Sequence, residues 1–177
     1  MKIWSIRHKL SEGIALIDYK NFDINAPHIF FQGERLGATW KEPAAHLNPA
    51  QPRASVVDFP FFEHGALLCS INAWNILQPY LQEEVELLPV DVEGYNYVLL
   101  NPIRVIDCLD RQQSKFTIYK TGRVIEVQHY VFQQEKLNGA YLFKTPELKR
   151  TDIYATEALR EAVEHHKLIG LDFRNLP

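Results

Sequence analysis

Apolar positions follow two different spacings along this chain, and each spacing predicts a different kind of element. Between residues 65 and 77 the apolar residues recur about every 3.6 positions, which predicts a helix over that range. Pro79 restricts the residue before it, so this helix is expected to end or kink close to Gln78. Residues 80–86 are expected to form a second short helix.

A further helix is predicted near the end of the chain, over residues 155–168. Its apolar residues lie on one stripe, Thr156 is the expected N-cap, and Gly170 is expected to end it. Two short segments near the start, residues 3–6 and 15–17, are expected to be strands.

Between the helices the spacing changes to one typical of strands. The predicted strands are residues 87–92, 95–100, 105–109, 116–120, 124–132 and 140–143. Glu93-Gly94 and Thr121-Gly122 separate neighbouring strands and predict tight hairpin turns, because glycine accepts a positive φ without steric cost.

Turn-forming residues dominate residues 21–52, which hold four prolines and two glycines and predict an irregular N-terminal arm. The whole pattern indicates an α+β fold with a mostly antiparallel sheet, a central helix and a C-terminal helix. We expect residues 1–57 to form an arm or small lobe packed on a main α+β domain of residues 58–177.

The composition also indicates in which cellular compartment the protein works. The first residues lack the apolar run of a secretory signal, and no stretch approaches the ~18–20 apolar residues that span a membrane. Cys69 and Cys108 have no metal-binding, redox or disulfide spacing, which favours a reducing compartment. We therefore expect a cytoplasmic protein without a membrane partner, a cofactor or a metal.

Charge is unevenly distributed, although the chain has a formal net charge of only −3. No lysine or arginine lies between Arg53 and Arg104, while that segment carries seven acids. Such a segment would attract a basic protein and repel nucleic acid. The expected partner-binding residues lie within it, on the acidic run and the turn that follows: Glu83, Glu84, Glu86, Asp91, Glu93 and Tyr95.

Catalytic alternatives are weaker. Cys108 lies between Asp107 and Asp110, and neighbouring acids raise a thiol pKa, so a buried apolar role is the better interpretation. Glu63 and His64 could act as a general base if a cleft surrounds them. A small hydrolase or transferase that uses Cys108 or Glu63/His64 is therefore the alternative hypothesis.

Several segments, taken in order, resemble a known family. They include DFPF at 58–61, ELLPV at 86–90, YNYVLLNPIRVIDCLDRQQSKF at 95–116, VFQQEKLNGAYLFK at 131–144, DIYATEALREAVEHH at 152–166 and LIGLDF at 168–173. This arrangement resembles the bacterial immunity proteins of polymorphic-toxin systems, a family formerly filed as a domain of unknown function.

The resemblance implies a protein that binds a cognate secreted antibacterial toxin and protects the producing cell, in systems such as type VI secretion. It brings no catalytic residue and no cofactor. Together with the charge pattern it leads to one hypothesis: a cytoplasmic immunity protein that covers the active site of a basic toxin with its acidic surface.

Overall fold

The computed structural model describes residues 1–17, 31–51 and 57–177. The helices in this part of the chain are α1 (Ile71–Leu81) and α2 (Glu157–His165), with short 3-10 helices η2 (Gly37–Thr39) and η4 (Gln134–Leu137). The strands are β1 (Ile3–His8), β2 (Ala15–Ile17), β3 (Ala44–Leu47), β4 (Leu67–Ser70), β5 (Val85–Leu88), β6 (Asp91–Val92), β7 (Tyr97–Pro102), β8 (Lys115–Ile118), β9 (Val124–His129), β10 (Leu142–Phe143), β11 (Ile153–Thr156) and β12 (Leu171–Asn175).

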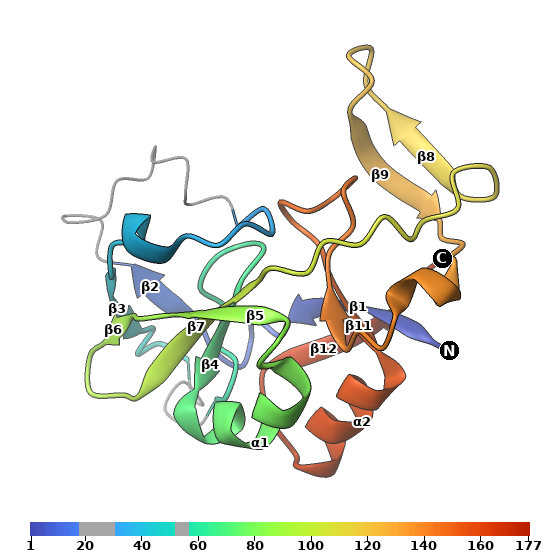
Figure 1. The fold of residues 1–177 in the computed structure, drawn as a ribbon. Coiled ribbons are helices and arrows are strands. Elements are labelled where there is room, and N and C mark those ends of the chain that lie inside the picture. Colours follow the sequence, from blue (N-terminus) through green and yellow to red (C-terminus); the bar gives the residue numbers. More distant parts are fainter. Residues whose placement is uncertain (18–30, 52–56) are drawn as a thin grey trace.

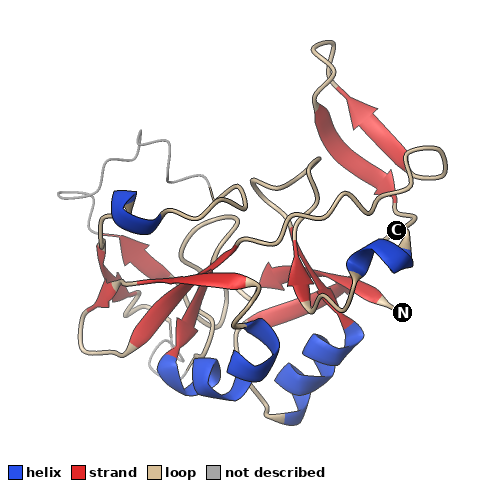
Figure 2. Cartoon of the chain, in the orientation of Figure 1, coloured by secondary structure: helices blue, strands red, loops and turns tan. Residues whose placement is uncertain are grey.

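The strands form several small sheets, and both helices lie together on one side of them (Figures 1 and 2). One sheet has the order β10-β11-β1-β12 and another the order β4-β7-β5, and every pair in these two sheets is antiparallel. The third sheet, β2-β3-β6, holds a parallel pair, β3 with β6. The predicted α+β class with mostly antiparallel pairing is confirmed.

The first residues of the chain lie inside a sheet. β1 is paired on one side with β11 and on the other with β12, so residues 3–8 form an inner strand between two segments from the C-terminal end. The strands expected at 3–6 and 15–17 are confirmed, whereas β3 was missed. The division after residue 57 stays a prediction, and residues 18–30 and 52–56 of the expected arm lie outside the described part.

The predicted helix over 65–77 is wrong at both ends. Residues 67–70 form β4, and α1 begins only after Ser70, whose Oγ accepts a hydrogen bond from the Ala73 N–H at 3.1 Å. Leu67 to Cys69 are all buried because β4 is covered on both faces, and a continuous apolar run does not distinguish strand from helix.

The helix also continues past Pro79 to Leu81, so the short helix expected over 80–86 does not exist. Proline removes one intrahelical hydrogen bond, which is tolerated here in the last turn of α1. Residues 85 and 86 of the expected helix belong instead to β5 (Val85–Leu88).

Pro89 divides the strand predicted over 87–92. β5 pairs with β7, where Leu87 lies opposite Leu100, while β6 leaves that sheet and joins β3. The Glu93-Gly94 turn is confirmed, with Gly94 at φ +76 and a 2.9 Å bond from the Tyr95 N–H to the Val92 carbonyl.

The other predicted hairpin and the C-terminal helix are confirmed, with shorter bounds, as β8–β9 and α2. Residues 105–109 form two isolated bridges and no strand. Thr156 occupies the N-cap position of α2, but its side chain makes no capping hydrogen bond.

Three clusters of buried side chains fill the interior. The first lies between the two helices and the sheets that contain β1 and β7, and the second lies around Phe31 and Trp40 beneath β2, β3 and β5. The third surrounds Tyr154 and includes Cys108. A buried lysine joins three loops nearby: the Lys144 ammonium donates to the carbonyls of Phe31, Gly65 (2.6 Å) and Lys149 (3.0 Å).

Candidate functional site

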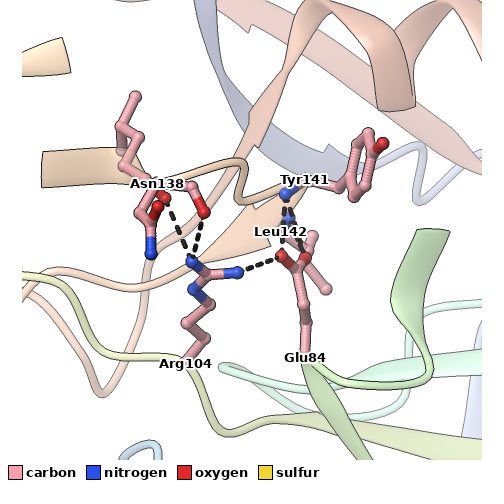
Figure 3. A network of polar contacts seen from close by, with 6 residues as sticks. Glu84, Arg104, Asn138, Tyr141 and Leu142 are labelled. Carbon is pink, nitrogen blue, oxygen red and sulfur yellow. Dashed lines mark hydrogen bonds and ion pairs between the residues drawn. The ribbon is translucent and has the colours of Figure 1, made fainter. Parts of the chain in front are cut away.

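Glu84, one of the expected partner-binding acids, is buried at 2% exposure and cannot reach a partner. Its carboxylate accepts hydrogen bonds from the backbone N–H groups of Tyr141 (2.9 Å) and Leu142 (2.5 Å), and pairs with the Arg104 guanidinium at 2.8 Å (Figure 3). Burial raises the pKa of Glu84, while these hydrogen bonds and the Arg104 charge oppose that shift. The prediction for Glu84 is therefore wrong.

The same ion pair connects distant parts of the chain. Arg104 donates from its other terminal nitrogen to the carbonyls of Leu137 (3.1 Å) and Asn138 (2.9 Å), at the end of η4 (Figure 3). Glu84 and Arg104 thus hold the loop before β10 against the loop before β5. An ion pair whose carboxylate is buried and also bonded to backbone amides fixes the relative position of the elements that it joins.

Glu86 also has a structural role. Its carboxylate accepts from the N–H groups of Leu36 (2.8 Å) and Gly37 (2.9 Å) and from the Asn101 side-chain amide (3.0 Å). Burial raises the pKa of this carboxyl, but the hydrogen bonds outweigh it and the pKa of Glu86 is lowered. Glu86 therefore anchors the start of η2 to β5, and most of its acceptor capacity is already used.

The remaining expected residues are exposed. Asp91, Glu93 and Tyr95 lie on β6 and the turn before β7, and Tyr95 is 41% exposed. Glu83 is exposed as well, but it precedes β5, whose four residues alone extend about 10 Å. The structure thus brings three of the six residues together at one turn and places Glu83 at the far end of a strand.

Two other aromatic residues of this region belong to the interior. Trp74 on α1 is 9% exposed and part of the first core cluster. The Tyr97 hydroxyl donates to the Val57 carbonyl at 2.6 Å. Tyr95 is therefore the exposed aromatic residue of this turn.

The residues of the alternative, enzymatic hypothesis do not converge. Cys108 is fully buried in the third core cluster, and burial raises the pKa of its thiol to about 12, so the reactive thiolate is scarce at neutral pH. His64 lines a hollow of about 230 Å³ beside His8 and Phe61, and that hollow includes neither Cys108 nor Glu63. The Glu63 carboxylate accepts a hydrogen bond from the backbone N–H of His64 at 2.9 Å, and not from its imidazole.

The β8–β9 hairpin was predicted from the sequence, but the exposed apolar surface that it carries was not. Ile118 (55%), Tyr119 (61%) and Ile125 (47%) are exposed around its turn, among basic residues such as Lys120 and Arg123. A signal was present in the sequence, since Ile118, Tyr119 and Ile125 lie close to the Thr121-Gly122 turn, just outside Lys120 and Arg123, where an exposed hairpin would usually be polar.

In the described ranges, no helix is long and apolar enough to cross a membrane. The same ranges contain no group of three or more histidine, cysteine or acidic side chains that could hold a metal ion.

The model of the immunity protein family Imm11 matches residues 80–176, which is more than half of the chain. This range begins in the last turn of α1 and contains the Glu84–Arg104 pair, the β8–β9 hairpin and α2. The resemblance drawn from the sequence segments is confirmed over this range. No curated protein matches the chain.

Proposed function

The chain belongs to the Imm11 immunity protein family, and from this premise we propose that it binds one cognate antibacterial toxin and neutralises it by physical occlusion. The family match is the observation that carries the proposal. The burial of Cys108 supports a binding role over the alternative use of that thiol as a nucleophile. The action would take place in the cytoplasm of the producing cell, against a toxin delivered between bacteria, for example by type VI secretion.

We place one toxin contact at the acidic turn formed by Asp91, Glu93 and Tyr95, and Glu83, exposed at the far end of β5, would be a separate contact. No lysine or arginine occurs in residues 57–103, so within this segment nothing basic neutralises these carboxylates. Exposed charges of one sign accelerate encounter with an oppositely charged partner, and an exposed tyrosine can supply buried contact area. The contacted toxin surface is therefore expected to be basic.

Co-expression tests the neutralisation. The toxin encoded next to this chain is expressed in a bacterial host with and without it, and growth is measured. We expect the chain to restore growth and to form a stoichiometric complex with the toxin on size exclusion. If growth inhibition is the same in both cultures, the proposed function fails.

Charge reversal tests the acidic turn. The variant Asp91→Lys/Glu93→Lys should slow association with the toxin about tenfold at low salt and flatten the salt dependence of the rate. The matched control, Glu135→Lys/Glu161→Lys, changes the charge by the same amount at exposed positions on η4 and α2. Equal rates for the two variants would remove the acidic turn from the interface while leaving neutralisation intact.

A further inference from the structure

The β8–β9 hairpin stands away from the rest of the molecule (Figure 1). Within the described ranges β8 and β9 pair only with each other, so each has an edge without a strand partner. The base of the hairpin is fixed, since the Tyr130 N–H donates to the Pro177 carbonyl at 2.9 Å and the Val131 N–H donates to Ser114 Oγ at 3.0 Å. An isolated two-stranded ribbon is marginally stable, so this one is suited to gain a further strand.

Exposed apolar side chains gather at this hairpin. Ile118, Tyr119 and Ile125, exposed at 55%, 61% and 47%, lie within eight consecutive residues. Scattered apolar residues on a surface need no explanation, but a cluster on a projecting element is typical of a protein-interaction site.

A groove runs along β9. One hollow of about 350 Å³ lies between the start of β9 and residues 146–151, and it shares Ile125 with a second hollow of about 350 Å³ that continues to the C-terminal residues. A third hollow of about 230 Å³ shares Arg7 and Arg174 with the second. The first two hollows therefore adjoin along β9, whereas the third lies farther from the hairpin and has no β9 residue in its lining.

The hollows have more basic than acidic side chains in their walls. Five basic residues line them, Arg7, Arg123, Lys149, Arg150 and Arg174, against the three acids Glu126, Glu147 and Asp152. Arg7 pairs with Asp152 at 3.1 Å, Arg174 with Asp172 at 2.7 Å, and Glu147 with Arg111 at 2.8 Å. Lys115 and Lys120 add positive charge on the hairpin itself. The charge of this surface is opposite to that of the acidic turn.

We propose that the groove beside β9 binds an extended, acidic segment of the toxin, which adds to the hairpin as a third strand. Its alternating apolar side chains would cover Ile125, and its carboxylates would face Arg123 and Lys149. Strand addition provides affinity through main-chain hydrogen bonds, and the side chains on alternate positions provide selectivity. This proposal rests on the proposed function for the identity of the partner, but the chemistry of the groove can be tested separately.

The first experiment needs no toxin. The full chain is titrated into two labelled eight-residue peptides, one alternating valine with glutamate and the other alternating valine with lysine, and fluorescence anisotropy is recorded. The acidic peptide should bind about tenfold more tightly at low salt, and high salt should abolish the preference. No binding of the acidic peptide, or equal binding of both peptides, would overturn the proposal.

Variants sharpen this test. Arg123→Glu/Lys149→Glu should reverse the preference between the two peptides, whereas the control Lys41→Glu/Lys167→Glu, which makes the same charge change at exposed positions outside the groove, should leave it unchanged. Ile125→Ser should weaken binding of the acidic peptide about fivefold without changing the melting temperature, because this groove-lining side chain is 47% exposed. An unchanged preference in the charge-reversed groove would contradict the proposal.

The second experiment uses hydrogen exchange in the complex with the toxin that the chain neutralises. Amides of β9 should exchange more slowly in the complex. Slowed exchange only at residues 91–95 would refute the hairpin site and leave the proposed function standing. Conversely, the acidic peptide could bind selectively while the chain fails to restore growth in co-expression with the toxin. That result would refute the proposed function and retain the groove as a peptide-binding site.

Discussion

Removing the Glu84 carboxylate should destabilise the whole fold, whereas the same change at the preceding residue, Glu83, should leave its stability almost unchanged. In Glu84→Ala the Arg104 guanidinium loses its counter-ion, and the N–H groups of Tyr141 and Leu142 lose their acceptor. Breaking one side of a buried ion pair costs about 3–5 kcal/mol. An orphaned buried amide costs about 1–3 kcal/mol.

These two contributions overlap and are reduced by solvent. The Arg104 side chain is 29% exposed and keeps two carbonyl acceptors, so the cost of breaking its ion pair lies at the low end of that range. Leu142 is fully buried, so water cannot replace the acceptor of its N–H. We therefore expect Glu84→Ala to lower the free energy of unfolding by about 4 kcal/mol.

The assay is urea unfolding followed by circular dichroism, with the free energy taken from linear extrapolation. Glu83→Ala is the matched control, because Glu83 is the preceding residue, has the same side chain and is exposed; its cost should be below about 0.5 kcal/mol. Arg104→Met completes a double-mutant cycle, in which the two single changes should not add. A cost of about 1 kcal/mol or less for Glu84→Ala, or strict additivity in the cycle, would refute the structural role of this pair.

Two predictions concern the pH dependence of stability. Burial lowers the pKa of Lys144 to about 7, so between pH 7 and about 10 the unfolded chain binds a proton that the native chain lacks, and the free energy of unfolding should rise with pH by up to about 1.4 kcal/mol per unit. Urea unfolding at several pH values should show this slope in the wild type and lose it in Lys144→Met, while equal slopes in both would contradict the assignment. Burial, and secondarily the charge of His64, lowers the pKa of His8 to about 4, so about 3 kcal/mol of stability should be lost as the pH falls from 6.5 to 4. In His8→Gln the free energy of unfolding should fall less steeply between pH 6.5 and 4. An unchanged slope would show that His8 is not the group responsible.

Elements whose conformation depends on neighbouring residues could be predicted from the sequence. The Glu93-Gly94 turn and the β8–β9 hairpin were predicted because a glycine at a positive φ fixes the turn locally, and α2 was predicted because its apolar stripe spans several turns. The β4–α1 junction was not, because Ser70 caps the helix after a buried strand whose apolar run has no periodicity of its own. The family could also be recognised from the sequence, because the order of its characteristic segments along the chain can be read without knowing how they pack.

The roles of individual acids were decided only by the tertiary structure. Glu83 and Glu84 are identical neighbours in the sequence, yet one is exposed and the other is buried against Arg104, twenty residues away, and the Leu142 amide, fifty-eight residues away. Charge and composition act at the level of a segment, whereas burial depends on which distant groups fold against a given side chain. The sequence by itself therefore determined an acidic segment, local turns and a family, and the fold determined that Glu84 and Glu86 hold the structure together while Asp91 and Glu93 remain exposed.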